Sequence, residues 1–114
     1  MQKYSRRDVK KLQKFLKELT PPKPDNSLVS ITKLGNMLYR LGFLEHSQSG
    51  SKRPYSHELL KDHLPLGRFL MTEAHGKRGQ MHYRNFVDYC LPSIELFLQI
   101  IEIEKLIIED EYNV

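Results

Sequence analysis

The 114-residue sequence predicts a single domain, mainly α-helical, with one small β-hairpin. Apolar residues recur at helical spacing over residues 5–19, over 30–41, and from Pro92 to about 109. A glycine-flanked turn separates two further apolar segments, which we expect to pair as a hairpin. Hydrophobic residues make up 39% of the chain. That content suffices for one core in a chain of this length, but leaves little room for a large catalytic cleft.

The first predicted helix covers residues 5–19. Its apolar stripe consists of Val9, Leu12, Phe15, Leu16 and Leu19. Ser5 is a suitable N-cap, and the opposite face carries Lys10, Lys14 and Lys17. Prolines then end the helix, because proline cannot continue it. We therefore expect residues 20–29 to form a stiff linker within the domain rather than a boundary between domains.

The second predicted helix covers residues 30–41, and Gly42 suits its C-terminal end. Its apolar stripe consists of Ile31, Leu34, Leu38 and Leu41, whereas Thr32, Lys33, Asn36 and Arg40 share the opposite face. A glycine inside a helix costs about 1 kcal/mol relative to alanine. Gly35 therefore indicates that another group approaches the backbone closely, and ordinary packing is the simplest such contact.

The central part of the chain is predicted to be extended and turn-rich. Residues 43–45 form a short strand, 47–54 a polar loop, and 57–64 one or two helical turns. The hairpin strands are residues 67–74 and 80–83, joined by the turn His75-Gly76-Lys77-Arg78-Gly79. These elements complete a body over residues 30–91.

Residues 92–114 are predicted to contain the last helix and an acidic tail. Pro92 suits the first turn of this helix, and residues 85–90 already show a helical pattern. This helix is apolar around most of its circumference, and such a wide face is usually buried on more than one side. Two interpretations follow. Ile100, Ile103 and Ile107 form an interface with a second copy or another protein, or the helix is the central core helix.

No catalytic, metal or cofactor motif is present in the sequence. Five histidines and one cysteine do not match a known zinc spacing, and no phosphate-binding glycine loop occurs. We expect Cys90 to be a small buried hydrophobe. A lone thiol is typical of a reducing compartment, and neither a signal peptide nor a membrane-spanning segment is indicated, so we expect a cytoplasmic protein.

The positive charge is concentrated in one part of the chain. Residues 1–90 carry 17 Lys and Arg against 8 Asp and Glu, a net +9, whereas residues 91–114 have a net charge of −5. A basic body favours a polyanionic partner, most simply nucleic acid. An ordinary solvated surface is the alternative interpretation.

The order of the elements favours a winged helix. A helix with a polar outer face is followed by a loop and then by a hairpin with a cationic tip, so that the helix would contact base edges and the wing the DNA backbone. The predicted DNA-binding residues are Thr32, Lys33, Asn36, Arg40, Lys52, Arg53, Lys77 and Arg78. The same residues are also compatible with a solvated helix face and a solvated turn.

The segment SITKLGNMLYRLGF (residues 30–43) resembles a helix in the KilAC-type C-terminal domain of phage antirepressors, whose pattern is S-x-x-x-L-x-x-x-L-x-x-L-G. Residues 72–97 resemble the closing portion of that domain, and the resemblance covers roughly residues 30–98. It implies a winged-helix-like DNA-binding regulator of transcription from a phage or mobile element. Two departures are the prolines directly before Ser30, where a first helix would be expected, and the lack of tryptophan.

The sequence therefore predicts a DNA-binding regulatory protein that acts on double-stranded DNA, and we expect it to form a homodimer or to bind another protein. The alternative is a protein–protein interaction module that docks a partner through its apolar C-terminal helix. An enzyme is the third class, and we do not expect one.

Overall fold

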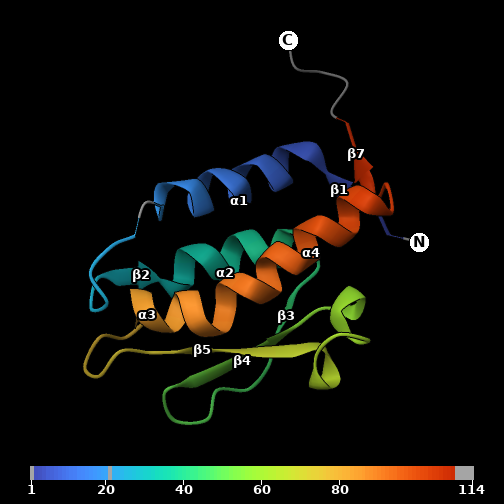
Figure 1. The fold of residues 1–114 in the computed structure, drawn as a ribbon. Coiled ribbons are helices and arrows are strands. Elements are labelled where there is room, and N and C mark those ends of the chain that lie inside the picture. Colours follow the sequence, from blue (N-terminus) through green and yellow to red (C-terminus); the bar gives the residue numbers. More distant parts are fainter. Residues whose placement is uncertain (1, 21, 110–114) are drawn as a thin grey trace.

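The computed structural model describes residues 2–20 and 22–109, which form one domain that is mainly helical and contains several small sheets (Figure 1). The α-helices are α1 (Arg6–Glu18), α2 (Ile31–Arg40), α3 (Tyr83–Asn85) and α4 (Leu91–Ile103). Short helical turns are η1 (Glu58–Leu60), η2 (Pro65–Gly67) and the π-helical η3 (Phe86–Cys90). The strands are β1 (Tyr4–Ser5), β2 (Leu28–Ser30), β3 (Leu44–Glu45), β4 (Lys52–Ser56), β5 (Arg68–Thr72), β6 (Gln80–His82) and β7 (Ile107–Ile108).

The first two predicted helices are confirmed, and a serine caps each of them. Ser5 Oγ accepts a hydrogen bond from the Arg7 N–H at 3.1 Å, and Ser30 Oγ accepts one from the Lys33 N–H at 3.0 Å. Each bond satisfies a backbone donor that the first helical turn leaves without a partner. Gly42 follows α2 with a φ of 87°, a left-handed conformation that favours glycine.

The predicted hairpin between residues 67–74 and 80–83 is wrong. β5 pairs antiparallel with β4, with Tyr55 opposite Phe69, and β6 pairs antiparallel with β2, with Val29 opposite Met81. These partners come from residues expected to be a polar loop (47–54) and a linker (20–29). The long-range pairing buries all four of these side chains, which a local hairpin could not achieve alone.

A tight turn nevertheless connects β5 to β6. The Ala74 N–H donates to the Gln80 carbonyl at 2.8 Å, and the Gln80 N–H donates to the Lys77 carbonyl at 3.1 Å. Lys77 and Arg78 are exposed in this turn. They therefore lie on a compact, hydrogen-bonded turn and not at the end of a two-stranded arm.

The predicted extent of the last helix is also wrong. α4 ends at Ile103, Lys105 adopts a φ of 56°, and the chain then enters β7, which pairs in parallel with β1. The Tyr4 N–H donates to the Leu106 carbonyl at 2.8 Å, and Arg6 forms ion pairs with Glu102 and Glu109 at 2.7 and 2.9 Å. These contacts with the N-terminal segment stabilise the change of chain direction that ends α4. Residues 110–114 of the predicted acidic tail lie outside the described residues.

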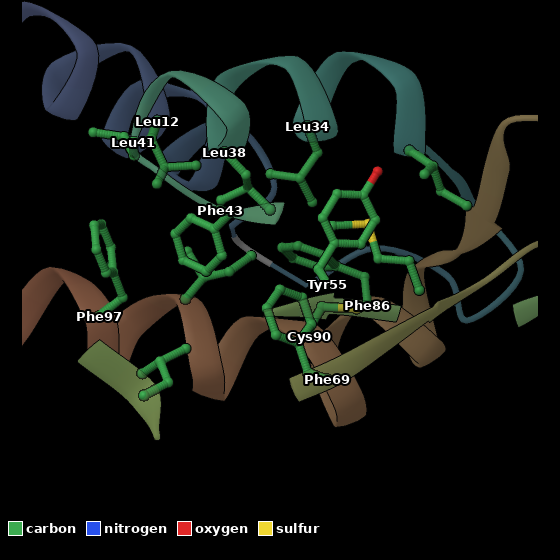
Figure 2. Packing of buried hydrophobic residues seen from close by; sticks show 14 of the residues in the cluster. Leu12, Leu34, Leu38, Leu41, Phe43, Tyr55, Phe69, Phe86, Cys90 and Phe97 are labelled. Carbon is green, nitrogen blue, oxygen red and sulfur yellow. The ribbon is translucent and has the colours of Figure 1, made fainter. Parts of the chain in front are cut away.

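The apolar face of α4 is mainly part of the core. Ile94, Phe97 and Ile101 are fully buried, and Figure 2 shows Phe97 facing the α2 side chains and Phe43 across the core. Ile100 is partly buried, Ile103 is 70% exposed, and Ile107 lies in a strand. The three residues predicted as an interface therefore do not form one continuous helical stripe. Among the described residues, no helix combines the length and apolar character needed to cross a bilayer.

Candidate nucleic-acid interface

A groove of about 370 Å³ separates the outer faces of α1 and α2. The two helices pack against each other, and α1 lies along α2 in Figure 1. The half-buried side chains of Phe15 and Met37 lie in this groove. The remaining lining residues are Lys11, Lys14, Glu18, Lys33, Asn36 and Arg40.

The groove is strongly positive, because four cations line it against one acid. In the part of the chain that the structure describes, no salt bridge involves Lys11, Lys14, Lys33 or Arg40. Lys33 Nζ lies 5.7 Å from the centre of the Phe15 ring, a cation–π contact that leaves its charge uncompensated. Like charges held together over a partly apolar floor favour the binding of a polyanion.

The polar face predicted for α2 is a ridge beside this groove. Thr32, Lys33, Asn36 and Arg40 are all exposed, because the four apolar positions on the other side of the helix are buried in the core. Tyr39 is 75% exposed on the same ridge. Tyr39 was not among the predicted site residues, although its helical position opposite Leu34 and Leu41 indicates an outward-facing side chain.

The turn at residues 75–79 lies next to the N-terminal end of α2. The Ile31 N–H donates to the Gly79 carbonyl at 2.8 Å. A Cβ at Gly79 would lie 3.1 Å from Thr32 Oγ1, and the φ of Gly79 is +76°. This close approach brings the segment that carries Lys77 and Arg78 to the same end of the molecule as Thr32.

Glu73 stabilises that turn. Its carboxylate accepts hydrogen bonds from the Gly79 N–H at 2.6 Å, from Gln48 Nε2 at 2.9 Å and from Arg53 Nη2 at 2.7 Å. The bond from Gly79 is the main cause of a lowered pKa for Glu73, and the bonds from Gln48 and Arg53 lower it further. The ionised carboxylate therefore links the turn to strand β4.

Two of the predicted DNA-binding residues lie away from the α1–α2 groove. Arg53 forms an ion pair with Glu73, and its side chain is only 17% exposed. Lys52 is exposed but lines a separate hollow with Arg68, Leu70 and Tyr89. Neither residue contributes to the positive groove in this arrangement.

A second hollow, of about 210 Å³, lies on the other flank of α2. It is lined by Thr32, Gly35, Asn36, Tyr39, Phe43, Glu45, Arg53 and Tyr55. Here the close approach expected at Gly35 is confirmed, since a Cβ at this position would lie 2.7 Å from the Tyr55 hydroxyl. The Tyr55 hydroxyl donates to the Glu45 carboxylate, and burial is the main reason that the pKa of Tyr55 is raised, with this hydrogen bond second.

Cys90 has the environment of a buried packing residue, as the sequence predicted. Its side chain is fully buried, and its thiol donates to the Leu70 carbonyl at 3.2 Å. Burial raises the pKa of the thiol to about 12. Because the thiolate is the reactive form of cysteine, this environment is the opposite of one that activates a nucleophile.

Among the described residues, His57 is the one buried histidine. Its Nδ1 accepts a hydrogen bond from the Leu59 N–H at 3.0 Å, so Nε2 carries the proton and donates to the Leu41 carbonyl at 2.8 Å. Burial lowers the pKa of His57, whereas the Leu41 carbonyl and Glu58 act in the opposite direction. Within residues 2–20 and 22–109, no group of three or more potential metal ligands is clustered.

Helix α1 contributes to the site although none of its residues was among the predicted site residues. The face of α1 opposite its apolar stripe carries Lys10, Lys11, Lys14 and Lys17, and the spacing of these residues was already visible. Sequence alone could not show that Lys11 and Lys14 share a groove with Lys33 and Arg40, because α1 and α2 meet only in the tertiary structure.

The chain matches no known protein-family model and shows no significant similarity to a curated protein or to a solved structure. The evidence for the candidate interface is therefore its geometry and its charge alone. The likeness to the phage antirepressor domain stays a prediction.

Proposed function

We propose that this protein binds double-stranded DNA through the groove between α1 and α2. The observation that carries the proposal is a set of four cations beside an exposed polar ridge, none of which forms an ion pair within the described part of the chain: Lys11, Lys14, Lys33 and Arg40. Phosphates supply most of the attraction between a protein and DNA, and each cation that neutralises one releases counterions. A groove of this charge has the chemistry to hold a phosphate backbone.

The ridge of α2 supplies side chains that can contact bases. Asn36 has the amide that pairs with the N6 and N7 edge of adenine, and Arg40 has the guanidinium that pairs with O6 and N7 of guanine. With α2 in the major groove, Lys11 and Lys14 would lie beside one strand of the backbone. The turn carrying Lys77 and Arg78 would lie beside the phosphates at the other end of α2.

This docking is the one that a winged helix uses, with a turn in place of the predicted hairpin wing. The phage antirepressor resemblance implies regulation of transcription, and this docking would suit such a regulator. Base contacts from Asn36 and Arg40 would supply sequence specificity, whereas the groove cations would supply affinity for any duplex.

The proposal is tested by fluorescence anisotropy with a labelled random-sequence duplex at several salt concentrations. We expect binding at low salt, with log K falling linearly against log salt by about 0.9 for each phosphate neutralised. No binding at low salt contradicts the proposal.

A pair of variants tests the location. Lys14→Ala with Arg40→Ala removes two groove cations, and we expect the salt slope to decrease by up to about 2. Lys3→Ala with Lys105→Ala removes two exposed cations that do not line the groove and have no salt bridge among the described residues, and this matched control should leave the slope nearly unchanged. Equal losses in the two double variants would show that the total charge matters and the groove does not.

A further inference from the structure

A hollow of about 580 Å³, the β5 hollow, lies where strand β5 meets the helical segment that leads from η3 into α4. In Figure 1, β5 passes alongside this segment. The side chains used below that line it are Lys52, Arg68, Leu70 and Tyr89. Among the described residues, it shares none with the lining of the α1–α2 groove, so it is a separate surface of the molecule.

The floor of the β5 hollow is apolar because the side chains of β5 alternate between the core and the outer face. Phe69 and Met71 are buried, whereas Leu70 between them is 38% exposed. Tyr89 is 62% exposed, and the half-buried Leu64 adds to the apolar lining. A contiguous apolar surface often marks a place where another molecule binds, whereas apolar residues exposed singly need no explanation.

Two cations flank this floor. Lys52 lies opposite Thr72 on the neighbouring strand, and Arg68 lies two residues before Leu70, so Leu70 is between the two charges along the sheet. Both cations are exposed, and neither forms a salt bridge within the described part of the chain.

The β5 hollow is net positive. Among the described residues that line it, Asp88 is the one acid, and it forms an ion pair with Arg84 at 2.8 Å. The charges of Lys52 and Arg68 are therefore available to a partner. Two such cations on either side of an apolar floor are complementary to an apolar side chain that has an acid on each side of it.

The local backbone also favours a functional surface. Tyr89 belongs to the π-helical turn η3. Turns of this kind are rare and frequently occur at functional sites.

We propose that the β5 hollow binds an extended acidic segment of another protein, in which a large apolar side chain has a carboxylate two residues to each side. An extended chain advances about 3.3 Å per residue, so the two carboxylates are about 13 Å apart. The cations have the same spacing, because Lys52 is level with Thr72, four residues from Arg68. Each carboxylate therefore faces a cation when the apolar side chain packs on Leu70 and Tyr89.

A protein segment suits this lining better than a nucleic acid does. Leu64, Leu70 and Pro92 offer aliphatic contacts, which neutralise no phosphate and read no base edge. The hollow also has two cations, against four in the α1–α2 groove. The inference is independent of the proposed DNA binding, since the two surfaces have no described lining residue in common.

The probe is a synthetic peptide with a central phenylalanine, a glutamate two positions to each side and serine elsewhere. An NMR titration of the ¹⁵N-labelled wild-type protein measures both its affinity and its location. We expect the amide signals of residues 68–72 and 88–93 to shift, and those of residues 11–18 and 33–40 to stay in place. Replacing the phenylalanine by serine should weaken binding by about 10-fold or more, because it removes the buried ring. Replacing both glutamates by glutamine should weaken it by about 5-fold, since exposed ion pairs contribute less.

One pair of double variants tests the charges. Lys52→Gln with Arg68→Gln keeps the length of both side chains and should weaken binding of the glutamate peptide by about 5-fold. The same variant should bind the glutamine peptide as well as the wild type does. Lys3→Gln with Lys105→Gln is the matched control, because it removes two exposed cations that do not line the hollow.

A pair of single variants tests the apolar floor. Leu70→Ala should weaken binding by about 3-fold or more. Leu44→Ala is its matched control, since Leu44 lies in β3, is 59% exposed and is not part of the hollow.

The proposal is wrong if the peptide does not bind, if only residues 11–18 and 33–40 shift, or if the serine peptide binds equally well. Equal losses in a variant and its matched control also contradict it. If Lys52→Gln with Arg68→Gln weakens binding of the random duplex as much as the groove variant does, the hollow contacts DNA instead. A wild-type protein that self-associates, and that this variant makes monomeric, would identify a second copy as the occupant and overturn the proposed partner. A failure of duplex binding alone contradicts the proposed function and does not alter the peptide result.

Discussion

Helices α2 and α4 have similar lengths, 10 and 13 residues, but they have different roles in the molecule. α2 buries one face and exposes the other, so its outer residues are available for a partner. α4 buries most of its circumference, with Leu96, Leu98 and Ile100 partly buried around its three fully buried core positions. The difference shows that a helix with a narrow apolar stripe keeps its polar face exposed to solvent. A helix with a broad apolar face becomes a core helix when other elements surround it.

The sharpest test of this comparison replaces one aromatic side chain on each helix. Phe97→Ala on α4 removes a fully buried ring and should decrease the free energy of unfolding by about 3–5 kcal/mol. Tyr39→Ala on α2 removes a mostly exposed ring and should change it by no more than about 0.5 kcal/mol. Urea denaturation measures both. Similar values for the two variants would contradict the assignment of α4 to the core.

A substitution at Gly35 tests how closely Tyr55 packs against the backbone of α2. Gly35→Ala should gain about 1 kcal/mol of helix propensity, but its Cβ would clash with the Tyr55 hydroxyl, and overpacking costs about 1–3 kcal/mol. We therefore expect a net loss of about 1 kcal/mol. In a Tyr55→Phe background the clash disappears, because the nearest ring carbons are then at ordinary contact distance.

The double-mutant comparison in urea isolates this contact. Gly35→Ala should be stabilising in the Tyr55→Phe background. If it is equally destabilising in both backgrounds, the close approach of Tyr55 does not explain the glycine.

The burial of His57 against Phe97 of α4 can be tested through the pH dependence of stability. Its pKa is lowered in the folded protein, so between that value and the ordinary value of 6.5 the unfolded chain binds more protons than the folded one. The stability contributed by neutral His57 is therefore complete above about pH 6.5 and decreases as the pH falls, by at most about 1.4 kcal/mol per pH unit. Urea denaturation from pH 7.5 to pH 5 measures the slope.

His57→Gln is the control for this slope. The variant will be less stable overall, because it changes the hydrogen bonds to Leu41 and Leu59, but the part of the pH dependence due to this histidine should disappear. An unchanged slope would assign the effect to other groups.

The smallest expected effect concerns the exposed end of α4. Ile103 is 70% exposed. Ile107, which was predicted to belong to the same interface, lies in β7 and therefore does not share a helix face with Ile103. We expect Ile103→Glu to change the free energy of unfolding by no more than about 0.5 kcal/mol and to leave the sedimentation coefficient unchanged. A wild-type dimer that this substitution converts to a folded monomer would restore the predicted interface.

The local features of the fold could be predicted from sequence. Ser5 and Ser30 cap the two helices that their positions indicated, and Cys90 is buried as its apolar neighbours suggested. The close approach at Gly35 was also predicted, although its partner, Tyr55, was not. All these features depend on residues within one or two helical turns of each other, or on burial alone.

The candidate site could be predicted only in part. Thr32, Lys33, Asn36 and Arg40 share one face of one helix, so periodicity alone was sufficient to group them. The involvement of Lys11 and Lys14 required the packing of α1 on α2. That Arg53 is neutralised by Glu73 required the pairing of β4 with β5. Charge counting could not distinguish cations that have an acidic partner from those that do not.

The sequence by itself determined where α1 and α2 begin, which of their faces are apolar and where the chain is basic, because caps and helical periodicity are local properties. The tertiary structure alone decided which strands pair, where α4 ends and which cations share a groove. Strands of two to five residues carry too little pattern to specify their partners, so burial of Val29, Tyr55 and Met81 in a common core selects the pairing. Likewise, the end of α4 depends on contacts with Tyr4 and Arg6, about 100 residues away in the chain.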